Sequence, residues 1–144
     1  MDFFTAMDIS ASALTAERTR MNLISGNLAN ANSTRSADGG PYKKKSAVMT
    51  ATPLTDSFNS ALNKAGKGLD TVKISEISED SSPPKMQYDP THPDANPQGY
   101  VALPNINVLE EMADMITASR VYEANVTAAQ ASKNMALKTL ELGK

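Results

Sequence analysis

The distribution of proline and glycine is the feature that most restricts how this chain of 144 residues can fold. All eight prolines and five of the seven glycines lie between Gly39 and Pro104. Proline in a helix interior costs about 3 kcal/mol, so long helices are confined to the two ends. We therefore expect three domains: N-terminal helical residues 1–34, a central region 35–104, and C-terminal helical residues 105–144.

The first proline-free end has the periodicity of an amphipathic helix over residues 3–31. Apolar residues recur at heptad spacing, interrupted by Ser10 and Glu17. The repeating positions are Met7, Leu14, Met21 and Leu28, with Phe3 and Ile24 at the companion positions. Such a seam predicts a helix that packs against another helix along one side.

The second proline-free end predicts a longer helix over residues 107–142, with a heptad seam and two polar interruptions. The seam consists of Met112, Met115, Ser119, Tyr122, Val126, Ala129, Lys133, Ala136 and Leu140. Asn107 followed by Glu110 resembles a capping box. We expect the two helices to pair as an antiparallel coiled-coil hairpin. Apolar residues outside the seam would then remain for neighbouring subunits to cover, namely Leu109, Ile116, Val121 and Leu137.

The central region has the composition of short strands and turns. Longer strands are expected at 42–52 and 70–79, and shorter ones at 85–88 and 99–103. Residues 53–68 are predicted to form a loop, within which 57–65 is compatible with a short helix. The fold class is therefore α+β, with long terminal helices around a small central β-hairpin and loop region.

The only histidine lies in a loop that offers the one candidate for catalysis or metal binding. Asp89, His92 and Asp94 are separated by prolines in Tyr88–Pro97. Asp, Asn and Pro are turn-forming residues, and a catalytic metal needs three ligands sheltered from water. We interpret the segment as a rigid loop with several turns, and keep an enzyme using these three residues as a less favoured alternative.

Other motifs have simpler interpretations. Gly39-Gly40-Pro41 is a turn, because the glycine that precedes the lysine of a phosphate-binding loop is missing. The lysine run 43–45 is typical of a solvated strand edge. Glu110 and Glu111 do not face each other on a helix and are assigned to the helix dipole. Met112, Met115 and Met135 fill a core or interface. Without cysteine, thiolate chemistry is excluded, and we expect no catalytic residue, cofactor or metal.

Charge and hydropathy restrict the partners and the location. The formal net charge of −2 gives no electrostatic footprint for nucleic acid. The first residues lack the basic and apolar regions of a cleavable secretory signal. No apolar run approaches the roughly 20 residues that span a bilayer. A membrane-surface role for residues 3–31 is weakly supported, since the polar face has two arginines and no lysine.

Two segments on the predicted helices carry a family signature. Residues 25–34 read S-G-N-L-A-N-A-N-S-T, and residues 116–125 read I-T-A-S-R-V-Y-E-A-N. Both resemble the signatures of the flagellar rod, hook and hook-associated axial proteins. The run from Tyr88 to Asn105, with Y-E-A-N-V at 122–126, is similar to the members that form the proximal rod.

The resemblance implies a structural subunit that polymerises into the rod of the bacterial flagellar basal body. This hollow shaft crosses the periplasm and transmits torque from the membrane ring to the hook. Its subunits pass unfolded through the flagellar type III export apparatus without a cleavable signal peptide. The implied partners are other rod proteins, the rod-base junction protein, the export apparatus and neighbouring rod subunits, with neither nucleic acid nor a small-molecule substrate.

We expect the assembly interface to use residues of both helices and of the proline-rich loop. They are Met7, Leu14, Met21, Ile24, Asn27, Leu28, Asn30, Tyr88, Pro90, Pro93, Tyr100, Met112, Met115, Tyr122, Asn125, Val126 and Leu140. An export-linked adapter or junction protein that binds through amphipathic terminal helices is the alternative. It differs from a rod subunit in stoichiometry and in whether it persists in purified basal bodies.

Overall fold

The computed structural model describes residues 3–36, 39–53 and 69–142, and it shows an α+β chain with a helix at each end. The helices are α1 (Phe3–Ala29) and α3 (Val108–Leu142). The strands between them are β1 (Lys45–Pro53), β2 (Asp70–Glu79), β3 (Lys85–Tyr88) and β4 (Tyr100–Leu103). The α+β class is confirmed. The short helix considered at 57–65 lies outside the described residues.

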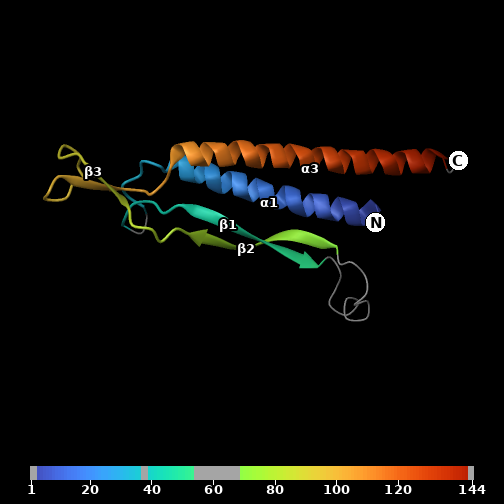
Figure 1. Cartoon of the computed structure of the whole chain (residues 1–144), viewed down its shortest axis with the longest axis horizontal. Coiled ribbons are helices and arrows are strands. Elements are labelled where there is room, and N and C mark those ends of the chain that lie inside the picture. The colour runs from blue at the N-terminus through green and yellow to red at the C-terminus, as the bar shows by residue number, and fades with distance from the viewer. Residues whose placement is uncertain (1–2, 37–38, 54–68, 143–144) are drawn as a thin grey trace.

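The two helices lie side by side and run in opposite directions (Figure 1). Asn27 hydrogen-bonds Glu111 near the end of α1, and the Ser119 hydroxyl lies 3.8 Å from the Met21 sulfur further along. Ala118 on α3 is fully buried. A side chain this small lets two helices approach closely, so their contact depends on small and polar groups as well as on large apolar ones.

The inward stripe of α3 agrees in part with the seam predicted for this helix. Its buried positions are Glu111 and Ala118, each one residue before a predicted seam position. The half-buried positions include Asn125 and six predicted seam residues, namely Met115, Ser119, Tyr122, Val126, Ala129 and Ala136. Met112, Lys133 and Leu140 of the predicted seam are exposed. The stripe includes Glu111 and Asn125, which a search for apolar periodicity passes over. Leu140 is exposed because α3 continues beyond the start of α1 (Figure 1).

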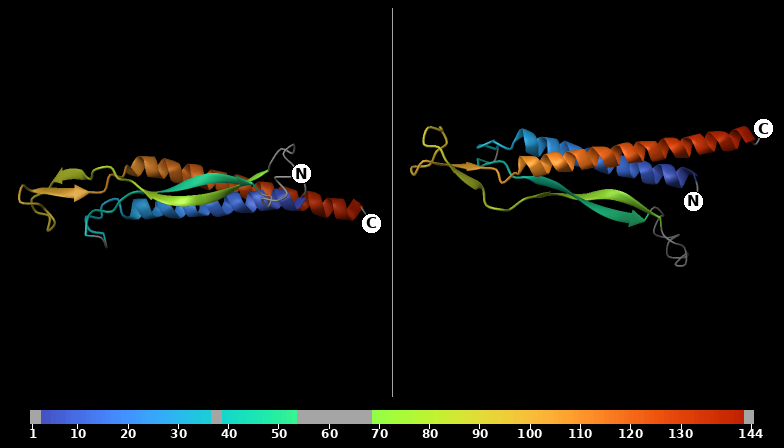
Figure 2. Two further views of the ribbon diagram at one scale, coloured as in Figure 1. Left: turned by 90° about the horizontal axis from the view of Figure 1, so that it is seen from below. Right: turned by 45° about the horizontal axis from the view of Figure 1, so that its top comes forward.

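Strands β1 and β2 form an antiparallel ribbon that follows α1 along its length (Figure 2). The register shifts between Val48 and Met49, an irregularity of the kind that increases the local twist of a ribbon. The backbone N–H of Val72 donates to the Ser12 hydroxyl at 3.2 Å, which ties β2 to the helix. The predicted strand at 70–79 is confirmed, while the first strand begins at Lys45 rather than at residue 42.

Strands β3 and β4 form a second antiparallel hairpin at the end of the molecule far from both chain ends (Figure 1). Both of the predicted short strands are confirmed, the second of them starting at Tyr100. Val101 points to the covered side and is buried, whereas Met86, Tyr88 and Tyr100 are exposed. The structure therefore has two small sheets and a thin core. In the part of the chain that is described, neither helix combines the length and hydropathy needed to cross a membrane.

Candidate assembly interface

Asn27 lies at the junction of α1, α3 and β1, and its side-chain amide makes four hydrogen bonds. Nδ2 donates to the Lys45 carbonyl and to Glu111 Oε2, both at 2.9 Å. Oδ1 accepts from the Lys45 N–H at 2.9 Å and from the Tyr42 hydroxyl at 3.1 Å. Because only 1% of Asn27 is exposed, water cannot replace these partners, and the buried amide depends on them. The amide therefore fixes the two helices and the ribbon relative to one another.

Glu111 supplies the buried charge of this junction. Its residue is 1% exposed, and Oε1 lies 2.7 Å from the Lys44 ammonium. Glu111 lies in the first turn of α3, where its N–H donates to the Asn107 carbonyl, while the Asn107 side chain accepts from the Leu109 N–H at 3.2 Å. The prediction that Glu111 serves the helix dipole misses this pairing. A buried carboxylate needs such a partner, since an unpaired buried charge is costly.

The junction also shifts the protonation of two groups from the 42–45 segment. The hydrogen bond to Glu111 raises the pKa of Lys44 above its usual 10.5. Burial raises the pKa of Tyr42 above its usual 10.0, because the phenolate is poorly solvated there. Both groups are therefore held in their protonated forms, which are the forms that donate hydrogen bonds to Glu111 and Asn27.

The segment that follows α1 holds the proline-rich loop in place. The Thr34 hydroxyl donates to Asp94 Oδ2 at 2.8 Å, and the Arg35 guanidinium lies 2.6 Å from Asp94 Oδ1. These contacts lower the pKa of Asp94, chiefly through the Thr34 hydrogen bond. Asn30 completes the helix end, with its side chain donating to the Gly26 carbonyl at 2.9 Å. Residues 25–34 thus position both α3 and the loop.

Tyr88 and Tyr100 form an edge-to-face pair at the base of the loop, with ring centroids 5.3 Å apart. Gly99 permits this arrangement. Its φ is +82°, and an added Cβ would lie 2.8 Å from Tyr88 Cε2 and 3.3 Å from the Pro90 Cβ. The loop is therefore built around a glycine that no other residue can replace without strain.

The polar groups considered for metal binding are used to shape the loop. Asp89 Oδ1 accepts from the Thr91 N–H at 3.1 Å and from the Thr91 hydroxyl at 2.6 Å. His92 Nδ1 accepts from the Asp94 N–H at 3.1 Å, and Thr34 and Arg35 hold the Asp94 side chain. Within the described residues, no group of three His, Asp or Glu side chains is placed to hold a metal ion. The loop interpretation accounts for all three residues.

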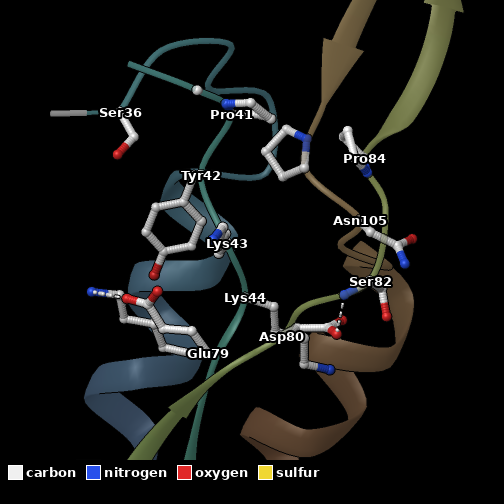
Figure 3. Close-up of a pocket in the computed structure, with 13 residues that line it drawn as sticks. Ser36, Pro41, Tyr42, Lys43, Lys44, Glu79, Asp80, Ser82, Pro84 and Asn105 are labelled. Carbon is white, nitrogen blue, oxygen red and sulfur yellow. Dashed lines mark hydrogen bonds and ion pairs between the residues drawn. The ribbon is translucent and has the colours of Figure 1, made fainter. Parts of the chain in front are cut away.

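A surface pocket of about 450 Å³ opens beside the junction, between residues 40–45 and the segments 79–84 and 104–105 that flank the β3–β4 hairpin. Figure 3 shows Pro41 and Pro84 on its two sides, with Tyr42 below them. At the floor, Asp80 Oδ1 accepts from the Ser82 N–H at 2.9 Å, and the Lys44 carbonyl accepts from the Asp80 N–H at 2.8 Å. Lys45 and Glu79 both line it and form an ion pair at 3.3 Å, and none of its described lining residues is a histidine.

Comparison with known proteins decides the family. The profile described as "Flagella basal body rod protein" matches residues 7–35, and "Flagellar basal body rod FlgEFG protein C-terminal" matches residues 98–142. The flagellar basal-body rod protein FlgC of Bacillus subtilis (strain 168) is 45% identical, with 100% of each chain covered. The chain belongs to the FlgC family.

Other FlgC proteins are similar over nearly their whole length. FlgC of Escherichia coli O6:H1 is 41% identical, with 99% of each chain covered. FlgC of Borreliella burgdorferi is 39% identical over 94% of this chain and 93% of that protein. The two family profiles meet in space at the junction, because Asn27 lies in the first and Glu111 in the second.

The residues predicted for the assembly interface of this FlgC-family chain fall into three groups. Ile24 and Asn27 are buried inside the chain. The half-buried residues are Leu14, Met21, Leu28, Asn30, Met115, Tyr122, Asn125 and Val126. The exposed residues are Met7, Tyr88, Pro90, Pro93, Tyr100, Met112 and Leu140. Only the last group is exposed and therefore available for direct contact with another molecule.

Sequence reasoning missed Glu111, Lys44 and Thr34 as residues that position this surface. A glutamate in the first turn of a helix is normally assigned to a favourable interaction with the helix dipole. A lysine near a strand edge is normally taken to be solvated. One signal was present, since Glu111 stands four residues before Met115 and continues the inward stripe of α3. The contact between Thr34 and Asp94 joins residues 60 positions apart, and no local pattern reveals it.

Proposed function

We propose that this protein is a structural subunit of the bacterial flagellar basal-body rod, located in the proximal rod. The observation that carries the proposal is its 45% identity to a flagellar basal-body rod protein over the full length of both chains. The chain would polymerise with neighbouring subunits into a hollow shaft that crosses the periplasm and transmits torque to the hook. No catalytic step is part of this function.

The geometry supports a role in assembly because α3 leaves large apolar side chains uncovered. Leu109, Met112 and Ile116 follow one side of α3 at helical spacing, and each is more than half exposed. Val121 and Leu137 are also exposed, as expected for residues outside the seam. Such rows mark surfaces that other proteins cover. We assign this row to contacts between subunits in the rod.

Each of the three expected domains has its own role in the proposed subunit. Residues 1–34 and 105–144 would pack as an antiparallel coiled-coil domain of the rod wall, and residues 35–104 would contact adjacent subunits. Exposed interface residues would make these contacts directly, while Asn27, Asn30 and Ile24 act by holding the helices in place. Torque transmission requires stiff subunits, and the junction of Asn27, Glu111 and Lys44 provides stiffness where three elements meet.

The proposed partners are other rod proteins, the rod-base junction protein and the flagellar type III export apparatus. Export through that apparatus without a cleavable signal peptide is part of the proposal. The alternative is an adapter or junction protein that binds only transiently. An immunoblot of purified basal bodies separates the two, because a rod subunit remains in the particle and a transient adapter is lost.

The loop gives the direct test of the proposal. The exposed prolines of residues 88–100 reduce the entropy lost when the loop is ordered against a neighbour. We expect the triple variant Pro90→Gly, Pro93→Gly, Pro97→Gly to impair rod assembly in a bacterium whose resident FlgC has been replaced by this chain. Pro53→Gly with Pro83→Gly, two exposed positions outside the loop, is the control. Normal motility of the triple variant would contradict the assignment of the loop.

A further inference from the structure

The β3–β4 hairpin presents an uncovered apolar face at one end of the elongated molecule (Figure 1). The strand register pairs Tyr88 with Tyr100 and Met86 with Ala102, so these side chains share one face. Tyr88 is 64% exposed and Met86 is 56% exposed. We refer to Met86, Tyr88 and Tyr100 as the head face. Its border carries Asp89, which has no ion pair among the described residues, whereas Asp94 is paired with Arg35.

The last turns of α3 present a second uncovered surface at the opposite end of the molecule. Lys133, Leu137 and Leu140 follow one side of the helix at spacings of four and three. Leu140 is 70% exposed and Leu137 is 48% exposed. Lys133 has no ion pair among the residues that the structure describes. We refer to Lys133, Leu137 and Leu140 as the tail stripe.

We propose that the head face of one copy of this chain binds the tail stripe of a second copy, with Asp89 opposite Lys133. Both surfaces are apolar at the centre and carry opposite charges at the border, which favours this pairing over head with head or tail with tail. A two-stranded hairpin is marginal alone, and a helix laid on its open face covers it.

The position of the two surfaces determines what the contact builds. Because they lie at opposite ends of the long axis, each bound copy leaves one head face and one tail stripe free (Figure 1). A contact between unlike surfaces does not close on two copies, and it extends into an open chain. The inference rests on the proposed function, because it supplies an end-to-end contact for a subunit that polymerises.

Site-directed cross-linking tests the pairing, and the chain has no native cysteine to interfere. We introduce Met86→Cys in one preparation and Leu140→Cys in another, and treat them with a short bis-maleimide at high protein concentration. Cross-linked dimers are expected only in the mixture, and the double variant Met86→Cys, Leu140→Cys is expected to give a ladder. Dimers from either single variant alone, or no dimer in the mixture, would overturn the proposal.

Charge exchange tests the border of the same contact. Asp89→Lys and Lys133→Asp should each weaken association about threefold, the effect of one exposed ion pair, and their combination in one chain should restore it. Asp89→Asn keeps the acceptor for Thr91 and so separates loss of charge from damage to the loop. Leu140→Glu should weaken association about tenfold or more. The control Thr127→Glu introduces the same charge at an exposed position of α3 that belongs to neither surface nor to the row of Leu109, and it should leave association unchanged.

Failure of the end-to-end contact can be distinguished from failure of the proposed function. If the cross-link is absent while the wild-type chain is retained in purified basal bodies, the end-to-end contact is wrong and the rod assignment stands. If the wild-type chain is absent from basal bodies, the rod assignment fails whatever the cross-linking shows. A tail stripe that cross-links only to a different rod protein would also overturn pairing between copies of this chain.

Discussion

The Asn27 side chain pairs with the backbone of Lys45 as an adjacent β-strand would. Its Oδ1 accepts the Lys45 N–H and its Nδ2 donates to the Lys45 carbonyl, both at 2.9 Å. The helix thereby satisfies both backbone groups of the residue at which β1 begins. Nδ2 also donates to Glu111, and Oδ1 also accepts from the Tyr42 hydroxyl. One side chain therefore sets the relative positions of α1, α3 and β1.

Replacing Asn27 with alanine should therefore destabilise the whole chain. The substitution removes four hydrogen bonds and leaves Glu111 and Lys45 with unsatisfied buried groups, for an expected loss of about 3 kcal/mol. Urea denaturation followed by circular dichroism measures it. Asn22→Ala, at an exposed asparagine of the same helix, is the control and should change stability by less than about 0.5 kcal/mol. Equal effects of the two variants would contradict the assigned role of Asn27.

Stability should fall at alkaline pH because of Lys44 and Tyr42. Their pKa values are raised in the folded chain, so both contribute stability in full below about pH 10. That contribution is lost as the pH rises through the raised values, since deprotonation removes the donors to Glu111 and Asn27.

This loss is measured by denaturation at pH values from about 9 to about 11.5. That range brackets the usual pKa values of both groups. Tyr42→Phe should flatten the alkaline fall, because the residue no longer titrates. Lys44→Met should flatten it too, at the cost of lower stability throughout. Lys43→Met changes an exposed lysine beside it and should leave the profile as in the wild type. A wild-type profile that rises across this range is incompatible with the proposed coupling.

Thr34 should control the order of the proline-rich loop. Thr34→Val preserves the shape of the side chain but removes the donor to Asp94, so amides of residues 91–98 should exchange with solvent faster. Thr34→Ser retains the hydroxyl and should protect them nearly as well as the wild type. Because the pKa of Asp94 is lowered, the anchor should also weaken as the pH falls through that lowered value. Unchanged exchange in Thr34→Val would show that the segment after α1 does not hold the loop.

Gly99→Ala should disrupt the Tyr88–Tyr100 pair. It combines left-handed backbone strain of about 1–2 kcal/mol with a contact of 2.8 Å to the Tyr88 ring. Gly39 has a φ of +84° but open space around its Cβ position, so Gly39→Ala isolates the backbone cost. We expect Gly99→Ala to lower the thermal midpoint more than Gly39→Ala does. The reverse order would mean that the tyrosine pair tolerates displacement.

The sequence revealed the elements of this fold more fully than their contacts. The absence of proline defined both helices, and alternation in residues 70–79 defined β2, because these patterns are local. The two buried positions of α3, Glu111 and Ala118, were each missed by one residue, since a helix pair held by small and polar groups gives little hydrophobic contrast. Asn27 and Asn30 were found through family resemblance, which does not state what each side chain bonds.

The positioning residues were missed for a different physical reason. Lys44 and Glu111 are charged, and charged residues are usually solvated unless the fold brings opposite charges together. That meeting depends on the path of the chain between α1 and β1, over residues for which sequence gives only turn signals. The same holds for the head face and tail stripe, whose separation along the molecule becomes visible only when the helices and hairpins are placed (Figure 1).

Imaging of purified basal bodies by electron cryomicroscopy, from a bacterium that relies on this chain as its FlgC, tests the assignment most directly. The proposed function predicts density for the antiparallel pair of α1 and α3 in the wall of the proximal rod, with the β3–β4 hairpin against a neighbouring subunit. A rod assembled without this chain, or density for the chain only outside the rod, would contradict it.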